Sequence, residues 1–74
     1  MPTVDMKSTG NNIRAMIKSK GYKISDIQKI FGFGTPQAIY KWMRGDSIPN
    51  VDNLVVMADI FGVTIADIIA VKKA

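Results

Sequence analysis

Residues 32–45 have the sequence GFGTPQAIYKWMRG, and this stretch decides the fold. Thr35 is a residue type that caps helices, and Pro36 suits the first helical position because its missing N–H costs nothing there. Gly45 suits the left-handed residue that ends a helix. The stretch therefore predicts a tight turn, a short helix capped by Thr35, and a stop at glycine.

The helix predicted between Thr35 and Gly45 has one apolar and one polar face. Ile39, Trp42 and Met43 are spaced i, i+3 and i+4 and share the apolar face. The other face carries an amide, a phenol and two cations, which are Gln37, Tyr40, Lys41 and Arg44. A helix that packs on one side and presents these groups on the other is suited to a nucleic-acid groove.

The composition excludes most catalytic and metal chemistry. The chain has 74 residues, enough for one domain, and 47% of them are apolar. It has neither cysteine nor histidine, which removes thiolate metal sites, disulfides, the commonest zinc ligand and the commonest general base. The acidic side chains are all aspartates and are scattered along the sequence. We therefore expect no enzyme activity, no metal and no cofactor.

The charge is unevenly distributed along the chain. Residues 1–45 hold eight lysines and arginines against two aspartates, whereas residues 46–74 hold two lysines against four aspartates. A polyanion would be attracted to the first half. The alternative is that the net charge of +4 simply keeps a small protein soluble.

Neither a membrane span nor a signal peptide is expected. No apolar run approaches the ~20 residues of a transmembrane helix. The first residues, MPTVDMK, lack the apolar core of a signal peptide. The sequence therefore predicts a cytoplasmic protein without a membrane partner.

Apolar residues at helical spacing predict four further helices. They cover residues 9–20, residues 24–31, the segment between Asn50 and Gly62, and the segment after Thr64. We expect residues 1–8 to form a flexible arm, residues 9–71 the domain, and residues 72–74 a tail. No segment alternates apolar and polar residues, so we expect no strands and an all-α fold.

Several residues are predicted to cap these helices. Thr9 or Asn11 would cap the first, and the cap of the second is open between Lys23 and Ser25. Asn50 would cap the fourth. Thr64 would cap the fifth, where Asp67 three residues later makes a variant of the capping box.

The order and spacing of these five helices resemble those of the helix-turn-helix domain of the Cro/cI-type repressors, the XRE family. The resemblance runs from about Asn11 to Ile69. It is carried by IYKW at 39–42 with Gly45, by Ile48-Pro49, by Asn53-Leu54, by Met57-Ala58, and by FGVT at 61–64. It implies a five-helix, lambda-repressor-like DNA-binding domain, with the helix between Thr35 and Gly45 in the major groove of double-stranded DNA.

The sequence departs from the family pattern in three places. The turn Gly32-Phe33-Gly34 is one residue longer than usual, and we expect Phe33 to pack inward. Ile17 and Met43 stand where the family often has an ion pair, and we expect an apolar contact between them. Pro36 replaces a polar residue that usually reads a base.

The resemblance implies roles for individual residues. Because Pro36 cannot read a base, direct contacts to bases are expected from Gln37, Tyr40 and Lys41. The phosphate contacts are expected from Lys23, Ser25, Thr35, Arg44 and Ser47. Asp46 is expected to turn away from DNA or to cap locally. For each residue the alternative is an ordinary solvated surface.

The protein is predicted to be a sequence-specific transcriptional regulator, and among regulators a repressor. We expect it to bind DNA as a homodimer, through Val56 and Ile60 or through Ala70 and Val71, without a small-molecule ligand. The alternative function is a protein-interaction module or an antitoxin-like partner on the same fold. A basic, amide-bearing front on the helix between Thr35 and Gly45 favours DNA.

Overall fold

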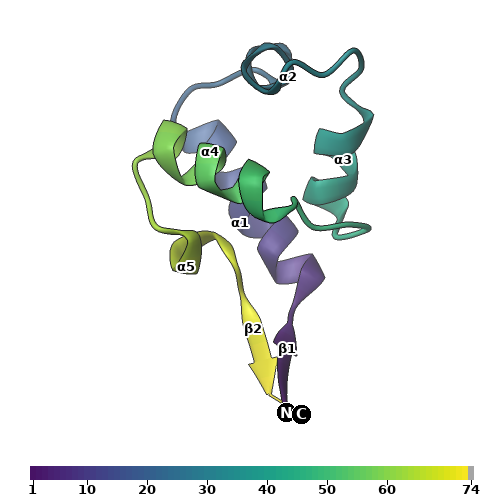
Figure 1. Ribbon diagram of the computed structural model, residues 1–74, viewed down its shortest axis with the longest axis vertical. Helices are drawn as coiled ribbons and strands as arrows, with labels where there is room; N and C mark the ends of the chain where they lie inside the picture. The colour runs from purple at the N-terminus through teal and green to yellow at the C-terminus, as the bar shows by residue number, and fades with distance from the viewer. Residues whose placement is uncertain (74) are drawn as a thin grey trace.

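The computed structural model describes residues 1–73 as five helices with a small sheet that joins the two ends of the chain (Figure 1). The helices are α1 (Met6–Ser19), α2 (Ile24–Phe31), α3 (Gln37–Arg44), α4 (Val51–Phe61) and α5 (Ile65–Ile68). The strands β1 (Pro2–Val4) and β2 (Val71–Lys73) pair antiparallel. The mostly helical, five-helix fold predicted from the sequence is confirmed, and the sheet is an addition to it.

The terminal sheet shows that the expectation of no strands was wrong. The paired residues are Pro2 with Lys73, Thr3 with Lys72, and Val4 with Val71. Beside them the backbone N–H of Asp5 donates to the carbonyl of Ala70 at 2.8 Å. Strands of three residues are too short to show alternation, and they pair only because the fold brings the termini together at one end of the molecule (Figure 1).

Regular structure therefore occurs in both terminal segments. Residues 1–8, predicted as a flexible arm, contain β1 and the start of α1, and residues 72–73 of the predicted tail belong to β2. The assignment of residues 9–71 as the domain stays a prediction.

The first helix starts earlier than predicted because Asp5 caps it. The Asp5 carboxylate accepts a hydrogen bond from the Ser8 backbone N–H at 3.0 Å. Thr9 is buried, and its hydroxyl accepts a bond from the backbone N–H of Ala70 at 2.9 Å. Asn11 is an exposed residue inside α1. Neither predicted cap is used, since Thr9 instead fastens the C-terminal segment to α1.

Two of the other capping predictions are confirmed. The Asn50 side chain accepts a bond from the Asn53 backbone N–H at 2.8 Å at the start of α4. Thr64 and Asp67 form the expected reciprocal capping box at the start of α5, with bonds of 2.9 and 3.1 Å. These caps depend on residues three positions apart, which is why the sequence alone could predict them.

At the start of α2 the cap is one of the two candidate residues, and at the start of α3 it is not the predicted residue. Lys23 occupies the cap position of α2, and the Asp26 carboxylate accepts its backbone N–H at 2.8 Å. Thr35 does not cap α3, contrary to expectation. That helix begins at Gln37 after Pro36, with no side-chain hydrogen bond at its cap.

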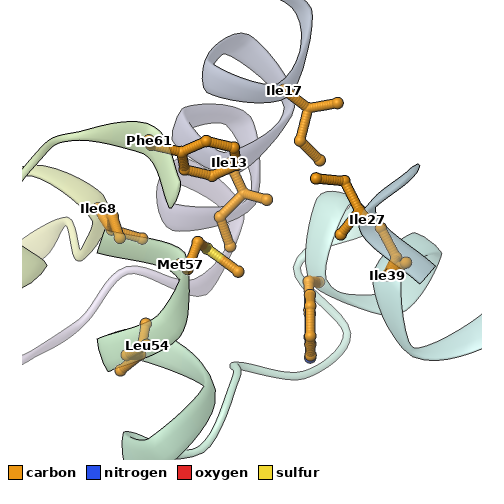
Figure 2. Packing of buried hydrophobic residues seen from close by; sticks show 9 residues of the cluster. Ile13, Ile17, Ile27, Ile39, Leu54, Met57, Phe61 and Ile68 are labelled. Atoms are coloured by element: carbon orange, nitrogen blue, oxygen red, sulfur yellow. The ribbon is translucent and has the colours of Figure 1, made fainter. Parts of the chain in front are cut away.

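The core is a single cluster of buried apolar side chains to which every helix contributes (Figure 2). Its members are Ile13, Ile17, Ile27, Ile39, Trp42, Leu54, Met57, Phe61 and Ile68. Trp42 is a core residue, as predicted, with only 4% of its surface exposed. Met43 packs against this cluster, and its direct contact with Ile17 stays a prediction.

The most extensive packing between two helices joins α1 and α3. Gly10 of α1 lies against the backbone carbonyls of Trp42 and Met43, and a β-carbon added to it would contact the first and lie 2.8 Å from the second. One turn later, Arg14 Nη2 donates to the Met43 carbonyl at 3.5 Å. Helix α1 therefore fixes the C-terminal turn of α3 by direct backbone contact.

The close approach at Gly10 gives the first prediction. Gly10→Ala should lower the free energy of unfolding by about 1–3 kcal/mol, because backbone carbonyls cannot rotate away from the added methyl group. Urea unfolding followed by circular dichroism measures this change.

Gly34→Ala is the matched control. Gly34 has an ordinary φ, and a β-carbon there would meet nothing within 4 Å, so this variant should be as stable as the wild type or slightly more so. Equal stabilities for the two variants would contradict the packing described for α1 and α3.

Backbone N–H groups at two helix starts lower the pKa values of the carboxylates to which they are hydrogen-bonded. The Ser8 backbone N–H lowers the pKa of Asp5 below its ordinary 3.8, and the Thr64 backbone N–H lowers that of Asp67 in the same way. A pKa that is lower in the folded state stabilises the protein above the unfolded value. This contribution is lost as the pH falls through the folded value, below 3.8.

Acid unfolding should therefore depend on these two caps. Asparagine also caps helices but does not titrate in this range, so the double variant Asp5→Asn, Asp67→Asn should lose less stability than the wild type between about pH 5 and about pH 2. Melting temperatures across this range provide the measurement. Identical acid profiles for the two proteins would show that the caps contribute nothing.

Candidate nucleic-acid interface

The polar side chains of α3 lie together on one surface of the molecule. Its opposite face is fixed in the core by Ile39 and Trp42, both buried. The outward side chains line an open hollow of about 350 Å³, and they are Gln37, Tyr40, Lys41 and Arg44. The structure therefore brings together all the residues that the sequence predicted on the polar face of this helix.

The other predicted contact residues lie outside this hollow. Lys23 and Ser25 are exposed at the start of α2, and Thr35 is exposed in the turn before α3. Ser47 is half-buried in the segment that follows α3. These residues belong to the segments that flank α3 or begin the neighbouring helix, and their roles toward phosphate stay predictions.

The turn between α2 and α3 is held by Gln28, a residue that the sequence analysis did not identify. The Gln28 carbonyl accepts the backbone N–H of Phe33 at 3.0 Å, and its side-chain amide donates to the Phe33 carbonyl at 3.1 Å. Gly32 ends α2 in the left-handed conformation, with φ of 70°. The longer turn is therefore bonded to the last turn of α2.

Aromatic packing fixes the turn to α3 as well. Phe33 stacks on Phe31 with ring centroids 5.4 Å apart, and both rings meet Trp42 edge-on at 5.7 and 5.5 Å respectively. Aromatic pairs in this range contribute beyond their buried area. The prediction that Phe33 packs inward is confirmed, and these contacts orient α3 relative to α2.

Arg44 and Asp46 form the only ion pair within residues 1–73. Arg44 Nε lies 2.9 Å from Asp46 Oδ2, and both side chains are 56% exposed. Gly45 lies between them in the left-handed conformation that ends α3, with φ of 79°. Asp46 was expected to turn away from DNA or to cap a helix locally; it pairs instead with the Arg44 side chain, and its orientation toward DNA stays a prediction.

Four of the six aspartates of the chain have local partners. Asp5, Asp26 and Asp67 accept backbone N–H groups at helix starts, and Asp46 pairs with Arg44. Within residues 1–73, Lys41 and the lysines of α1 and α2 have no ion-pair partner. The positive charge of this half of the molecule therefore remains available to a polyanion.

A family model described as a helix-turn-helix domain, HTH_3, matches residues 13–68. The chain belongs to the HTH_3 helix-turn-helix family. The matched range holds α2, the turn, α3 and all nine residues of the core cluster of this HTH_3 domain. Neither the curated proteins nor the solved structures contain a match to the chain.

Membership in the HTH_3 family, which is the Cro/cI-type (XRE) family predicted from the sequence, implies DNA binding. It identifies the chain as a DNA-binding domain and not a catalytic one. No helix within residues 1–73 of this HTH_3 domain is long and apolar enough to cross a membrane. The same residues hold no cluster of acidic side chains that could ligate a metal.

Proposed function

We propose that this protein is a sequence-specific regulator of transcription that binds double-stranded DNA with α3 in the major groove. The observation that supports this most is the α3 hollow. Its four polar side chains project from a short helix whose other face is fixed in the core. In helix-turn-helix domains the second helix of the motif enters the groove. Repression by occupying the bound site is the simplest regulatory outcome.

The base contacts are assigned to three residues of the hollow. Gln37, in the first turn of α3, can bond N6 and N7 of adenine together. Lys41 can reach a guanine edge or a phosphate, and Tyr40 can bond a phosphate or touch a thymine methyl group. Their position on one face of α3 supports this assignment.

The phosphate contacts are assigned to the flanking segments. Lys23 and Ser25 lie at the start of α2, where backbone N–H groups also favour an anion. Thr35 and Ser47 lie before and after α3. Contacts of this kind fix the register of a protein on the duplex without reading its sequence.

We also propose a homodimer on paired half-sites, with no small-molecule ligand. The outer face of α4 exposes Val51, Val55 and Val56, and Val71 of β2 is exposed as well. The sequence predicted contacts through Val56 and Ile60 or through Ala70 and Val71. Val56 and Val71 are exposed, whereas Ile60 is partly buried against the core, so the valines carry this proposal. A regulator of this kind acts in the cytoplasm, on the chromosome.

The same valines favour a second function, a protein-interaction module or antitoxin-like partner on this fold. Single exposed apolar residues are normal on a protein surface, but three exposed valines on one helix form a larger apolar area than is usual. The basic and amide-bearing hollow on α3 favours DNA over this alternative.

Substitutions in the hollow test the DNA assignment. Gln37→Ala should weaken binding to a duplex recovered from a random library by about 1–3 kcal/mol and leave random DNA nearly unaffected. Lys41→Ala, where the lysine meets phosphate, should weaken both and lower the salt slope by about one. Fluorescence anisotropy at two salt concentrations measures these changes.

Lys73→Ala is the charge-matched control for Lys41→Ala. Lys73 lies in β2, away from α3 (Figure 1), so its loss should leave the salt slope nearly unchanged. Unchanged binding in both the Gln37 and the Lys41 variant would rule out this surface as the DNA-binding face.

A further inference from the structure

The Arg44–Asp46 ion pair lies at the edge of the α3 hollow. Nε of Arg44 is 2.9 Å from Oδ2 of Asp46, so the carboxylate holds the guanidinium from its side. Arg44 nevertheless lines the hollow together with Gln37, Tyr40 and Lys41. The guanidinium thus has one acidic partner while it still faces the surface assigned to DNA.

The geometry of the pair leaves the end of the guanidinium free. Among residues 1–73, the two terminal nitrogens of Arg44 have no hydrogen-bond partner. A guanidinium is planar, and its terminal nitrogens form a rigid fork of parallel donors. This fork matches the O6 and N7 acceptors of guanine in the major groove.

Asp46 also changes which acceptor Arg44 prefers. A carboxylate at 2.9 Å offsets the positive charge of Arg44, which weakens its attraction to a phosphate. The carboxylate itself repels a phosphate placed nearby. A guanine edge has two acceptors but no net charge, so it avoids this repulsion. A guanidinium already held in place also loses less side-chain freedom when it binds.

We propose, on the basis of the DNA-binding function above, that Arg44 reads a guanine and that Asp46 positions it. This replaces the phosphate role predicted for Arg44 from the sequence. Gln37 and Arg44 are separated by seven residues, or about 10 Å along a helix axis. At 3.4 Å per base pair, the guanine lies roughly three base pairs from the base that Gln37 reads.

Selection from a random duplex library, repeated with the wild type and Arg44→Lys, tests this proposal. Lysine keeps the positive charge but lacks the fork. The wild type should select a guanine at one position, and Arg44→Lys should lose that preference by roughly 5- to 150-fold, the range of one bidentate contact. Its affinity for random DNA should stay within about twofold, because the phosphate attraction is kept.

Asp46→Ala tests the positioning role, with Asp59→Ala as the matched control. Both variants remove one exposed carboxylate, but Asp59 lies on α4, away from the hollow. Asp46→Ala should weaken the guanine preference several-fold while random DNA binds as well or better. Asp59→Ala should keep the preference. Thermal unfolding confirms that each variant is folded.

The outcomes separate this inference from the proposed function. If the wild type selects no sequence at all, the proposed function fails. If it selects a sequence that Arg44→Lys selects equally well, the guanine contact is overturned and the proposed function stands. If Asp46→Ala and Asp59→Ala behave alike, Asp46 has no positioning role.

Discussion

The carbonyl oxygens of Trp42 and Met43, in the C-terminal turn of α3, lie against Gly10 of α1 with no room for a β-carbon between them. The position of the α3 hollow depends on this contact, because it sets the depth at which α3 sits. Trp42 is buried beneath it, and the Phe31–Phe33 pair meets the ring of Trp42 from the turn. A helix of eight residues is too short to hold a position by itself, so its orientation comes from these tertiary contacts.

The second constraint is the placement of negative charge. Helix starts use the carboxylates of Asp5, Asp26 and Asp67, where they satisfy backbone N–H groups and complement the helix dipoles. Asp46 is the exception, since its partner is a side chain that lines the α3 hollow. Four of the six aspartates thus have local partners, and the lysines of α1, α2 and α3 stay available to an anionic partner.

Much of this structure is predictable from the sequence because it depends on neighbouring residues. The polar face of α3, the glycine stops and the caps at Asn50 and Thr64 all involve residues within one or two helical turns. The resemblance to the Cro/cI-type family added the lambda-repressor-like arrangement of the helices and the role expected of the third one, which local periodicity cannot supply.

The features that the sequence did not reveal depend on distant or backbone contacts. Thr9 resembles a helix cap but bonds Ala70, 61 positions later, and the terminal sheet forms only once the ends meet. Gln28 holds Phe33 through a backbone conformation that Gly32 creates. The Arg44–Asp46 pair forms across Gly45, which ends α3 in the left-handed conformation. No hydrophobic pattern encodes any of these contacts.

The most direct test of the account is a titration of the ¹⁵N-labelled protein with a duplex selected from a random library, followed by amide chemical shifts. If α3 enters the major groove, the largest changes should occur in residues 37–44 and at the start of α2, with small changes in α5 and the terminal sheet. Changes confined to α4, with residues 37–44 unaffected, would contradict the assignment of α3 as the DNA-binding helix.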